Sequence, residues 1–173
     1  MEGSLVFAAR ARNEVEEVKM NEVRFVVLQP TGKRCIGTSD LNGCTVVAIV
    51  SPYAAILAHI PPTPDVASPS PQAGDQNVRA KMDEVAILFH QHKNYFPSQS
   101  TTWVVSAVYE GKIALPDQKV IIEEKLRQMG LVYAQVIYVV KRAGEPRPPA
   151  HGTVFVDARG GSPVVYVDDR RVN

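Results

Sequence analysis

Cys44 and His59 are the two side chains whose types and spacing could support nucleophilic catalysis. Cys44 follows the turn "LNG" and begins the apolar run "CTVVAIVS", whereas His59 lies near the end of the next run, "AAILAHI". A cysteine nucleophile needs a thiolate, a base that forms it, and donors for the oxyanion that its attack creates. If the two runs are antiparallel strands broken at Pro52, the imidazole returns to the edge of the sheet where Cys44 lies. The spacing therefore predicts a Cys–His pair.

Residues just before Cys44 supply candidates for the remaining roles. Backbone N–H groups near Asn42, Gly43 and Cys44 could point into a pocket and hold an oxyanion, because they lie at a junction of turn and strand, and Gly43 has no Cβ that would block a substrate carbonyl. Thr38, six residues before Cys44, could orient the imidazole through its hydroxyl or its carbonyl. Asp40 is a rival for that role, and the spacing does not separate the two.

A purely structural explanation of these residues stays open. A cysteine at the start of a strand is typically a core residue, and a histidine after an apolar run is commonly a surface or satisfied residue. The second cysteine, Cys35, is expected to fill space beside the site. An alternative role for Cys35 is that of a resolving thiol, which would make Cys44 a redox switch or tie it up in a disulfide.

The charge balance excludes some classes of partner. The chain has 173 residues, of which 19 are Lys or Arg and 18 are Asp or Glu, so the net charge is +1. This balance gives no basic footprint for nucleic acid or an anionic membrane. We see no signal peptide or membrane-spanning run, and two cysteines are too few for a disulfide framework. We therefore expect a single cytoplasmic domain over residues 1–173, with an oligomeric state that the sequence leaves open.

The hydrophobic patterns predict many strands and few helices. Strands are expected at residues 4–9, 22–29, 44–51, 54–60, 101–110, 133–141, 152–158 and 163–169, the last two as a hairpin through Gly160 and Gly161. One helix is expected from Asp75, which could cap it as Asn77 could, and another at residues 116–129, ended by Gly130. Because helices and strands do not alternate regularly, the pattern indicates an α+β fold with mixed or antiparallel sheets.

Two proline-rich segments interrupt this pattern, at residues 61–75 and 142–150, and we interpret both as mobile surface loops. The remaining histidines do not suggest a metal site. His90 and His92 are two residues apart on a helix and point to different faces, and His151 has no acidic or cysteine neighbours at ligand spacing. We expect no metal and no cofactor.

The order of Thr38, "LNGC", an apolar strand and "LAHIPP" resembles the chemoreceptor glutamine deamidase family, CheD. That family has a threonine, a "GxGSC" turn, a "VAV" strand and a "GxAHxxLP" segment, with the same spacing from threonine to cysteine. The resemblance implies a layered β-sandwich of mixed sheets flanked by helices, a fold that CheD shares with cytotoxic necrotizing factor toxins and YfiH-type cysteine hydrolases.

The resemblance also implies a catalytic set, with Cys44 as nucleophile, His59 as base and acid, and Thr38 as the group that orients the imidazole. The reaction it implies is hydrolysis of a glutamine side-chain amide in a protein, through a thioester. The substrate protein is not identified by the sequence, and the proline-rich loops are unlike those of a bacterial chemotaxis protein. Two alternatives remain: a non-catalytic protein-binding module on the same fold, and a cysteine hydrolase acting on a small molecule.

Overall fold

The structure, a computed structural model, describes residues 3–64 and 70–173. Its helices are α1 (Leu5–Ala11), α2 (Ala73–Gln91) and α3 (Pro116–Gln128), with a 3-10 turn, η1, at Lys93–Tyr95. The strands are β1 (Val15–Glu17), β2 (Val23–Val27), β3 (Cys35–Thr38), β4 (Thr45–Val50), β5 (Ala54–Ile60), β6 (Thr101–Tyr109), β7 (Lys112–Ile113), β8 (Tyr133–Val139), β9 (Val154–Asp157), β10 (Val164–Val167) and β11 (Arg170–Arg171).

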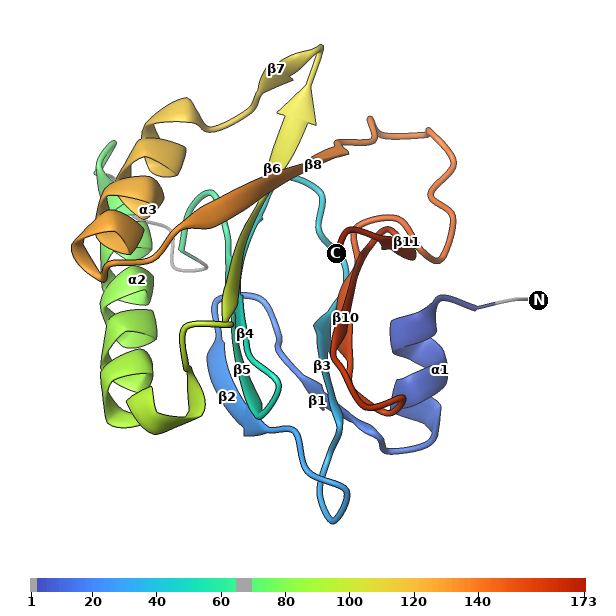
Figure 1. Ribbon diagram of the computed structural model, residues 1–173. Coiled ribbons are helices and arrows are strands. Elements are labelled where there is room, and N and C mark those ends of the chain that lie inside the picture. The colour runs from blue at the N-terminus through green and yellow to red at the C-terminus, as the bar shows by residue number, and fades with distance from the viewer. Residues whose placement is uncertain (1–2, 65–69) are drawn as a thin grey trace.

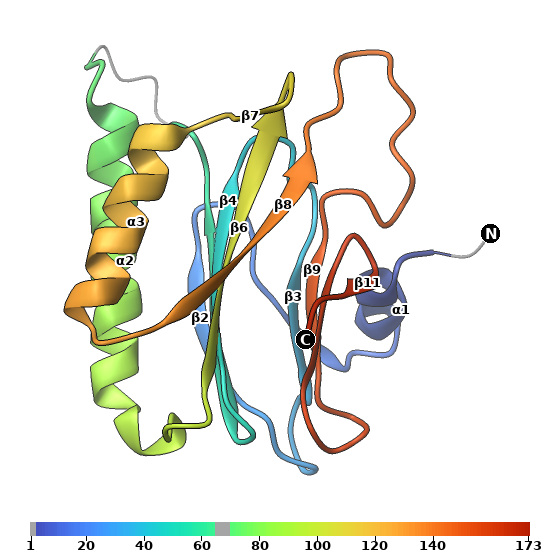
Figure 2. The same cartoon turned by 45° about the horizontal axis from the view of Figure 1, so that its top comes forward.

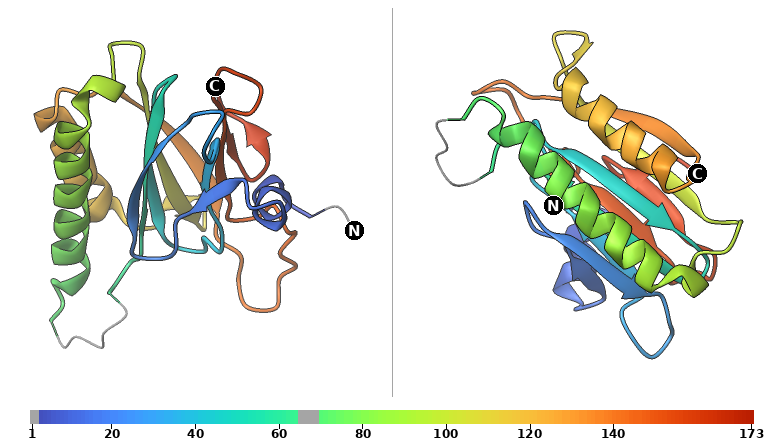
Figure 3. Two further views of the ribbon diagram at one scale, coloured as in Figure 1. Left: turned by 90° about the horizontal axis from the view of Figure 1, so that it is seen from below. Right: turned by 90° about the vertical axis from the view of Figure 1, so that its left-hand side faces the viewer.

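The strands form two sheets that pack face to face. The first sheet has the order β1-β3-β9-β10-β11, and the second has the order β2-β5-β4-β6-β7, with β8 pairing parallel to β6. Helices α2 and α3 lie side by side over the outer face of the second sheet, and α1 lies on the outer face of the first (Figures 1, 2 and 3). The α+β sandwich of mixed sheets flanked by helices that the sequence predicted is therefore confirmed.

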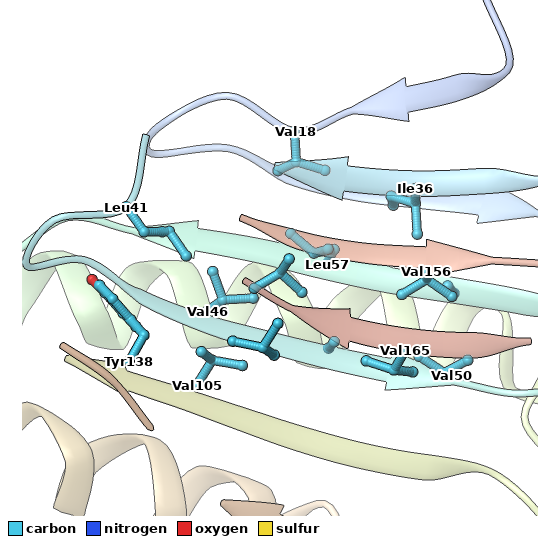
Figure 4. Close-up of a cluster of buried hydrophobic side chains, with 14 of the residues drawn as sticks. Val18, Ile36, Leu41, Val46, Val50, Leu57, Val105, Tyr138, Val156 and Val165 are labelled. Carbon is cyan, nitrogen blue, oxygen red and sulfur yellow. The ribbon is translucent and has the colours of Figure 1, made fainter. Parts of the chain in front are cut away.

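The largest hydrophobic cluster fills the space between the two sheets (Figure 4). Side chains alternate across each strand, so β4 sends Val46 and Ala48 into this cluster and sends Val47 and Ile49 toward α2 and α3. Both faces of β4 and β5 are thus covered, so every residue of these two strands is buried. This explains why both strands are continuous apolar runs in the sequence, without alternation of apolar and polar residues. The residues of this cluster that are labelled in Figure 4 include Val18, Ile36, Leu41, Leu57, Val105, Tyr138, Val156 and Val165.

The expected strands at the centre of the second sheet are confirmed. β4 and β5 are antiparallel neighbours, as the positions of the two apolar runs indicated, and β5 has the predicted bounds. The β9–β10 hairpin is also antiparallel. Helix α3 ends before Gly130, which has a φ of +75° that glycine adopts without strain.

The strand predicted at residues 4–9 is wrong, because this segment belongs to helix α1. Ser4 caps the helix by accepting a hydrogen bond from the Phe7 amide, and the buried side chains Val6 and Ala9 are three residues apart on one face. Spacing by three is helical, although a short apolar run does not distinguish the two structures.

The start of α2 differs from the expected one by two residues. The helix begins at Ala73, after the N-cap position Gln72, and Asp75 lies inside its first turn, where a carboxylate favours the helix dipole. Asp75 and Asn77 are therefore not its caps. Of the predicted loop at residues 61–75, residues 65–69 lie outside the described part of the chain, and residues 142–150 form neither helix nor strand. No helix in the described ranges is long and apolar enough to cross a membrane.

Candidate active site

His59 is held at the end of β5, between the two sheets. It pairs with Val46 of β4, and its side chain lies on the face that Ala55 and Leu57 turn toward the first sheet. The His59 Nδ1 atom lies 2.7 Å from the Thr38 hydroxyl oxygen, which reaches across from β3 of the first sheet. The two sheets therefore bring together a pair of residues that are 21 positions apart in the sequence.

A second hydrogen bond of Thr38 fixes which His59 nitrogen carries the proton. The Thr38 hydroxyl donates to the Val18 carbonyl oxygen at 2.6 Å. A hydroxyl has one proton, and this one is used on a group that can only accept. The Thr38 oxygen must then accept from His59, so the neutral imidazole carries its proton on Nδ1 and a lone pair on Nε2. The Nε2 atom is buried and has no hydrogen-bond partner among the described residues.

Burial sets the protonation state of this imidazole. Only 2% of His59 is exposed, and desolvation lowers its pKa to about 4, with Asp40 partly opposing the shift through its negative charge. At neutral pH the ring is therefore uncharged and its Nε2 lone pair can take a proton. The structure also distinguishes the two candidates for the residue that orients the imidazole. The Thr38 hydroxyl is bonded to the ring, whereas the described contacts of Asp40 include a hydrogen bond from Ser39.

Cys44 comes directly before β4 and faces the same inter-sheet space as His59. It belongs to the hydrophobic cluster that also holds Val46, two residues further along the strand, and 6% of it is exposed. Since Val46 pairs with His59, Cys44 occupies the diagonal position on the same face. Diagonal neighbours have Cα atoms about 7–8 Å apart, a span that long side chains bridge. Cys44 and His59 therefore share one face of the sheet, whereas a contact between the sulfur and the imidazole stays a prediction.

The turn that carries Cys44 is held by the end of β8. The Gly43 amide donates to the Tyr138 hydroxyl at 2.9 Å, and that hydroxyl donates to the Cys44 carbonyl oxygen at 2.7 Å. The Asn42 side chain accepts from the Lys141 amide at 2.8 Å and donates to the Lys141 carbonyl at 3.0 Å. Because the Gly43 amide is engaged, the predicted oxyanion role of Asn42 and Gly43 stays a prediction, and at Gly43 it would require exchange of this bond.

The segment after His59 borders the approach to the turn. A Cβ on Gly43 would lie 3.6 Å from the Pro62 ring, so this glycine and proline are close neighbours. Both line a cavity of about 490 Å³ together with Ile113 of β7, with Leu115 at the start of α3, and with Val140. The Pro62 carbonyl accepts from the Gln118 side chain at 2.8 Å, which ties this wall to α3. The cavity thus adjoins the residue before Cys44.

Cys35 is separated from this site by the first sheet. Both cysteines are thiols without a disulfide. Cys35 packs in the cluster beside α1, whereas Ile36 and Thr38 point to the inter-sheet side. Burial raises the pKa of the Cys35 thiol to about 12, with a further contribution from Asp157. The expected space-filling role fits this position, and a disulfide with Cys44 does not fit the two opposite directions.

His92 and His151 have other partners. The His92 ring stacks on Phe25 at a centroid distance of 3.8 Å, and the His151 Nε2 atom lies 2.7 Å from the Val139 carbonyl oxygen. Among the described residues no three His, Cys, Asp or Glu side chains are grouped to hold a metal ion.

Sequence reasoning missed Val18 and Tyr138. Val18 contributes only a backbone carbonyl, which no side-chain pattern reveals. Tyr138 is 94 residues from Cys44, within a strand whose composition is typical of any sheet. A signal for Tyr138 exists only in the topology, because β8 pairs with β6 and so ends next to the Cys44 turn.

Comparisons with known proteins add little beyond this geometry. No protein-family model matches the chain, and no curated protein matches it. Among solved structures, the C-terminal domain of CNFy from Yersinia pseudotuberculosis is similar with a TM-score of 0.40 and 9% sequence identity. The match covers 87% of this chain and 54% of that one, so the chain spans about half the length of the structure it matches.

Proposed function

We propose that this protein is a cysteine-dependent amide hydrolase that deamidates glutamine side chains in a protein substrate. The observation that carries the proposal is the hydrogen-bond pattern of His59. Thr38 and Val18 fix the Nδ1–H tautomer, and the Nε2 lone pair is left in the space that Cys44 faces. A general base for a thiol requires such a lone pair, and its approach to the Cys44 sulfur is part of the proposal.

The chemistry follows from these atoms. The Nε2 atom of His59 takes the thiol proton while the Cys44 sulfur attacks the amide carbon, and an oxyanion forms on the amide oxygen. The resulting imidazolium gives its proton to the amide nitrogen, the C–N bond breaks, and ammonia leaves a thioester behind. Water, deprotonated by the same nitrogen, then hydrolyses the thioester to a carboxylic acid and the free thiol. Because burial lowers the pKa of His59, its protonated form is a stronger acid than an exposed imidazolium and gives its proton to the leaving nitrogen more readily, whereas its neutral form is a weaker base toward the thiol.

The resemblance to CheD supports the choice of a glutamine side chain as the substrate group. A slender side-chain amide also suits a reaction centre at which Cys44 and His59 are almost completely buried. A second candidate, a cysteine hydrolase acting on a small molecule, is favoured by the neighbouring cavity, since about 490 Å³ is within the size range of small-molecule pockets.

Selective alkylation is the first test. We expect iodoacetamide at pH 7 to label Cys44 faster than Cys35, whose high pKa keeps it protonated. Both His59→Ala and the bulkier His59→Gln should slow the labelling of Cys44 at least about tenfold, because the base is lost. Peptide mapping by mass spectrometry measures both sites in one sample. Equal, slow labelling of the two cysteines, or labelling of Cys44 that is indifferent to His59, would favour the non-catalytic binding module.

Deamidation itself is tested on a panel of glutamine-containing proteins, peptides and small amides. Ammonia release is measured together with the mass difference between an amide and an acid at the modified residue. Cys44→Ala should abolish both signals, and Cys35→Ala, which changes the outer cluster, should keep them. Turnover of small amides without any protein product would support the second candidate instead.

A further inference from the structure

Tyr138 joins the Cys44 turn to the sheet through a single hydroxyl group. Its oxygen accepts from the Gly43 amide, and its proton is donated to the Cys44 carbonyl. These two backbone groups lie on either side of the Gly43–Cys44 peptide bond. A hydroxyl that is bonded to both groups restrains the backbone dihedral angles on either side of that peptide. It therefore restrains the position of the Cys44 Cα atom, from which the side chain extends.

The residues around Tyr138 hold its hydroxyl group in one position. Tyr138 is 2% exposed, and its ring packs in the inter-sheet cluster at the same end as Leu41 (Figure 4). Burial holds the pKa of Tyr138 well above its usual value, so the hydroxyl keeps the proton that it donates. Gly43 has a φ of +136°, in a region that glycine adopts without a steric penalty.

We infer that Tyr138 is a positioning residue for the nucleophile, which presets the Gly43–Cys44 turn for attack and holds the Gly43 amide until it exchanges this bond for one to the oxyanion. The inference rests on the proposed function, because a role in catalysis presupposes that Cys44 attacks a carbonyl. In this role Tyr138 acts on the backbone of the turn and not on the reacting atoms. Its effect is transmitted through the two hydrogen bonds to the turn.

Two reactions of Cys44 separate positioning from a merely structural role. With p-nitrophenyl acetate the sulfur forms a bond to the acyl carbon, His59 Nε2 takes the thiol proton, and p-nitrophenolate leaves through a tetrahedral oxyanion. With iodoacetamide the sulfur displaces iodide directly, and no oxyanion forms. The ratio of the acetylation rate to the alkylation rate therefore reports the stabilisation of the oxyanion, and it cancels the fraction of folded protein and the access to the thiol.

We expect Tyr138→Phe to lower this ratio about tenfold to a hundredfold, because a small misplacement of reacting groups has effects of that size. Tyr133→Phe is the matched control. Tyr133 lies in the same strand, but its hydroxyl donates to Glu123 at 2.7 Å, far from the turn, so the ratio should not change. Burst release of p-nitrophenolate and intact mass of the modified protein measure the two rates.

A second variant keeps the test decisive if Tyr138→Phe folds poorly. Asn42→Ala removes the other tie between the turn and β8 at an exposed position, and it should lower the same ratio by a smaller factor. An unchanged or higher ratio in the folded variants would overturn the role of Tyr138, while the proposed function stands. A wild-type protein in which Cys44 is not acetylated, or is acetylated independently of His59, would contradict the proposed function itself.

Discussion

The two halves of the candidate site are held by different means. His59 belongs to a regular strand and is fixed by a ladder of backbone hydrogen bonds, with one side-chain contact to Thr38. Cys44 comes just before its strand, in a turn over residues 41–44 that side chains and backbone groups of residues 138–152 hold in place. We call these the His59 half and the Cys44 half.

The difference shows that one half of the site is stably held while the other half can change its conformation. The His59 half shares the central strands of the sandwich, so it should open only when the whole domain unfolds. The Cys44 half depends on Tyr138 at the end of β8 and on residues 140–152, a segment without helix or strand that can change without disturbing the central ladder. Such a division suits a reaction in which the base stays fixed while the turn that carries the nucleophile admits the substrate. Substitutions that damage one half and spare the other test it.

Gly152→Ala should be the most damaging change to the Cys44 half. Gly152 has a φ of +71°, and a Cβ there would lie 2.1 Å from the Leu41 carbonyl oxygen, in the backbone of the turn. The left-handed conformation costs about 1–3 kcal/mol for a side chain, and forced overpacking costs about 1–3 kcal/mol more. We expect the free energy of unfolding, measured in urea, to fall by about 4 kcal/mol as the sum of the two effects.

Gly144→Ala is the matched control, because Gly144 has a φ of +86° in the same segment but nothing within 4 Å of the added Cβ. It should show the strain alone, about 1–3 kcal/mol. In Gly152→Ala, native-state hydrogen exchange should accelerate at Gly43 more than at Ala58 beside His59. Equal losses of stability in the two variants would mean that the contact with Leu41 does not hold the turn.

The His59 half should respond to pH. The pKa of His59 is about 4 in the folded protein and 6.5 in the unfolded chain, because burial disfavours the charged ring. Between these values the unfolded chain binds the proton and the folded protein does not. The free energy of unfolding should therefore decrease as the pH falls from about 6.5 to about 4. The difference between the two pKa values corresponds to a decrease of about 3 kcal/mol.

Other groups titrate in the same range, so the measurement is a difference between variants. Urea unfolding at several pH values should show a flatter dependence for His59→Gln than for the wild type. His90→Gln, on an exposed position of α2, should follow the wild type. A His59→Gln curve parallel to that of the wild type would mean that the ring is not buried as a neutral group.

The same contrast explains what could be predicted from the sequence. Strands β4 and β5 were predictable because they are adjacent in the chain and uniformly apolar, and their pairing places Cys44 and His59 on one face. Cys44, His59 and Thr38 were predicted as a group from a motif within 22 residues of sequence, and of these the structure brings Thr38 of β3 into contact with His59 of β5.

The features that were not predictable depend on contacts distant in sequence or on the backbone alone. α1 was predicted as a strand because a short apolar run reads either way until its neighbours are known. β3 is four residues long and contains a glycine, so no pattern marked it, although it carries Thr38. The Tyr138 bonds join positions 94 and 95 residues apart, and only the parallel pairing of β8 with β6 brings them into contact.

Thr38→Val should have the smallest effect on stability and a distinct effect on reactivity. The substitution keeps the shape of the side chain and removes the hydroxyl, which leaves the buried Val18 carbonyl oxygen without its donor. One unpaired buried group costs about 1–3 kcal/mol, so we expect a loss of about 2 kcal/mol in urea. The ring of His59 is then free to carry its proton on Nε2, and this tautomer cannot accept the proton of Cys44.

Reactivity distinguishes this tautomer effect from a general loosening of the fold. Iodoacetamide labelling of Cys44 at pH 7 should slow in Thr38→Val about as much as in His59→Gln, although the stability loss is modest. Thr38→Ser restores the hydroxyl and should recover most of the labelling rate, since both hydrogen bonds can form again. Nitrogen chemical shifts of the ring should report Nδ1–H in the wild type and in Thr38→Ser. If Thr38→Val retained both the Nδ1–H tautomer and the wild-type labelling rate, then Thr38 would only fill space in the His59 half, and the base would be oriented by its strand alone.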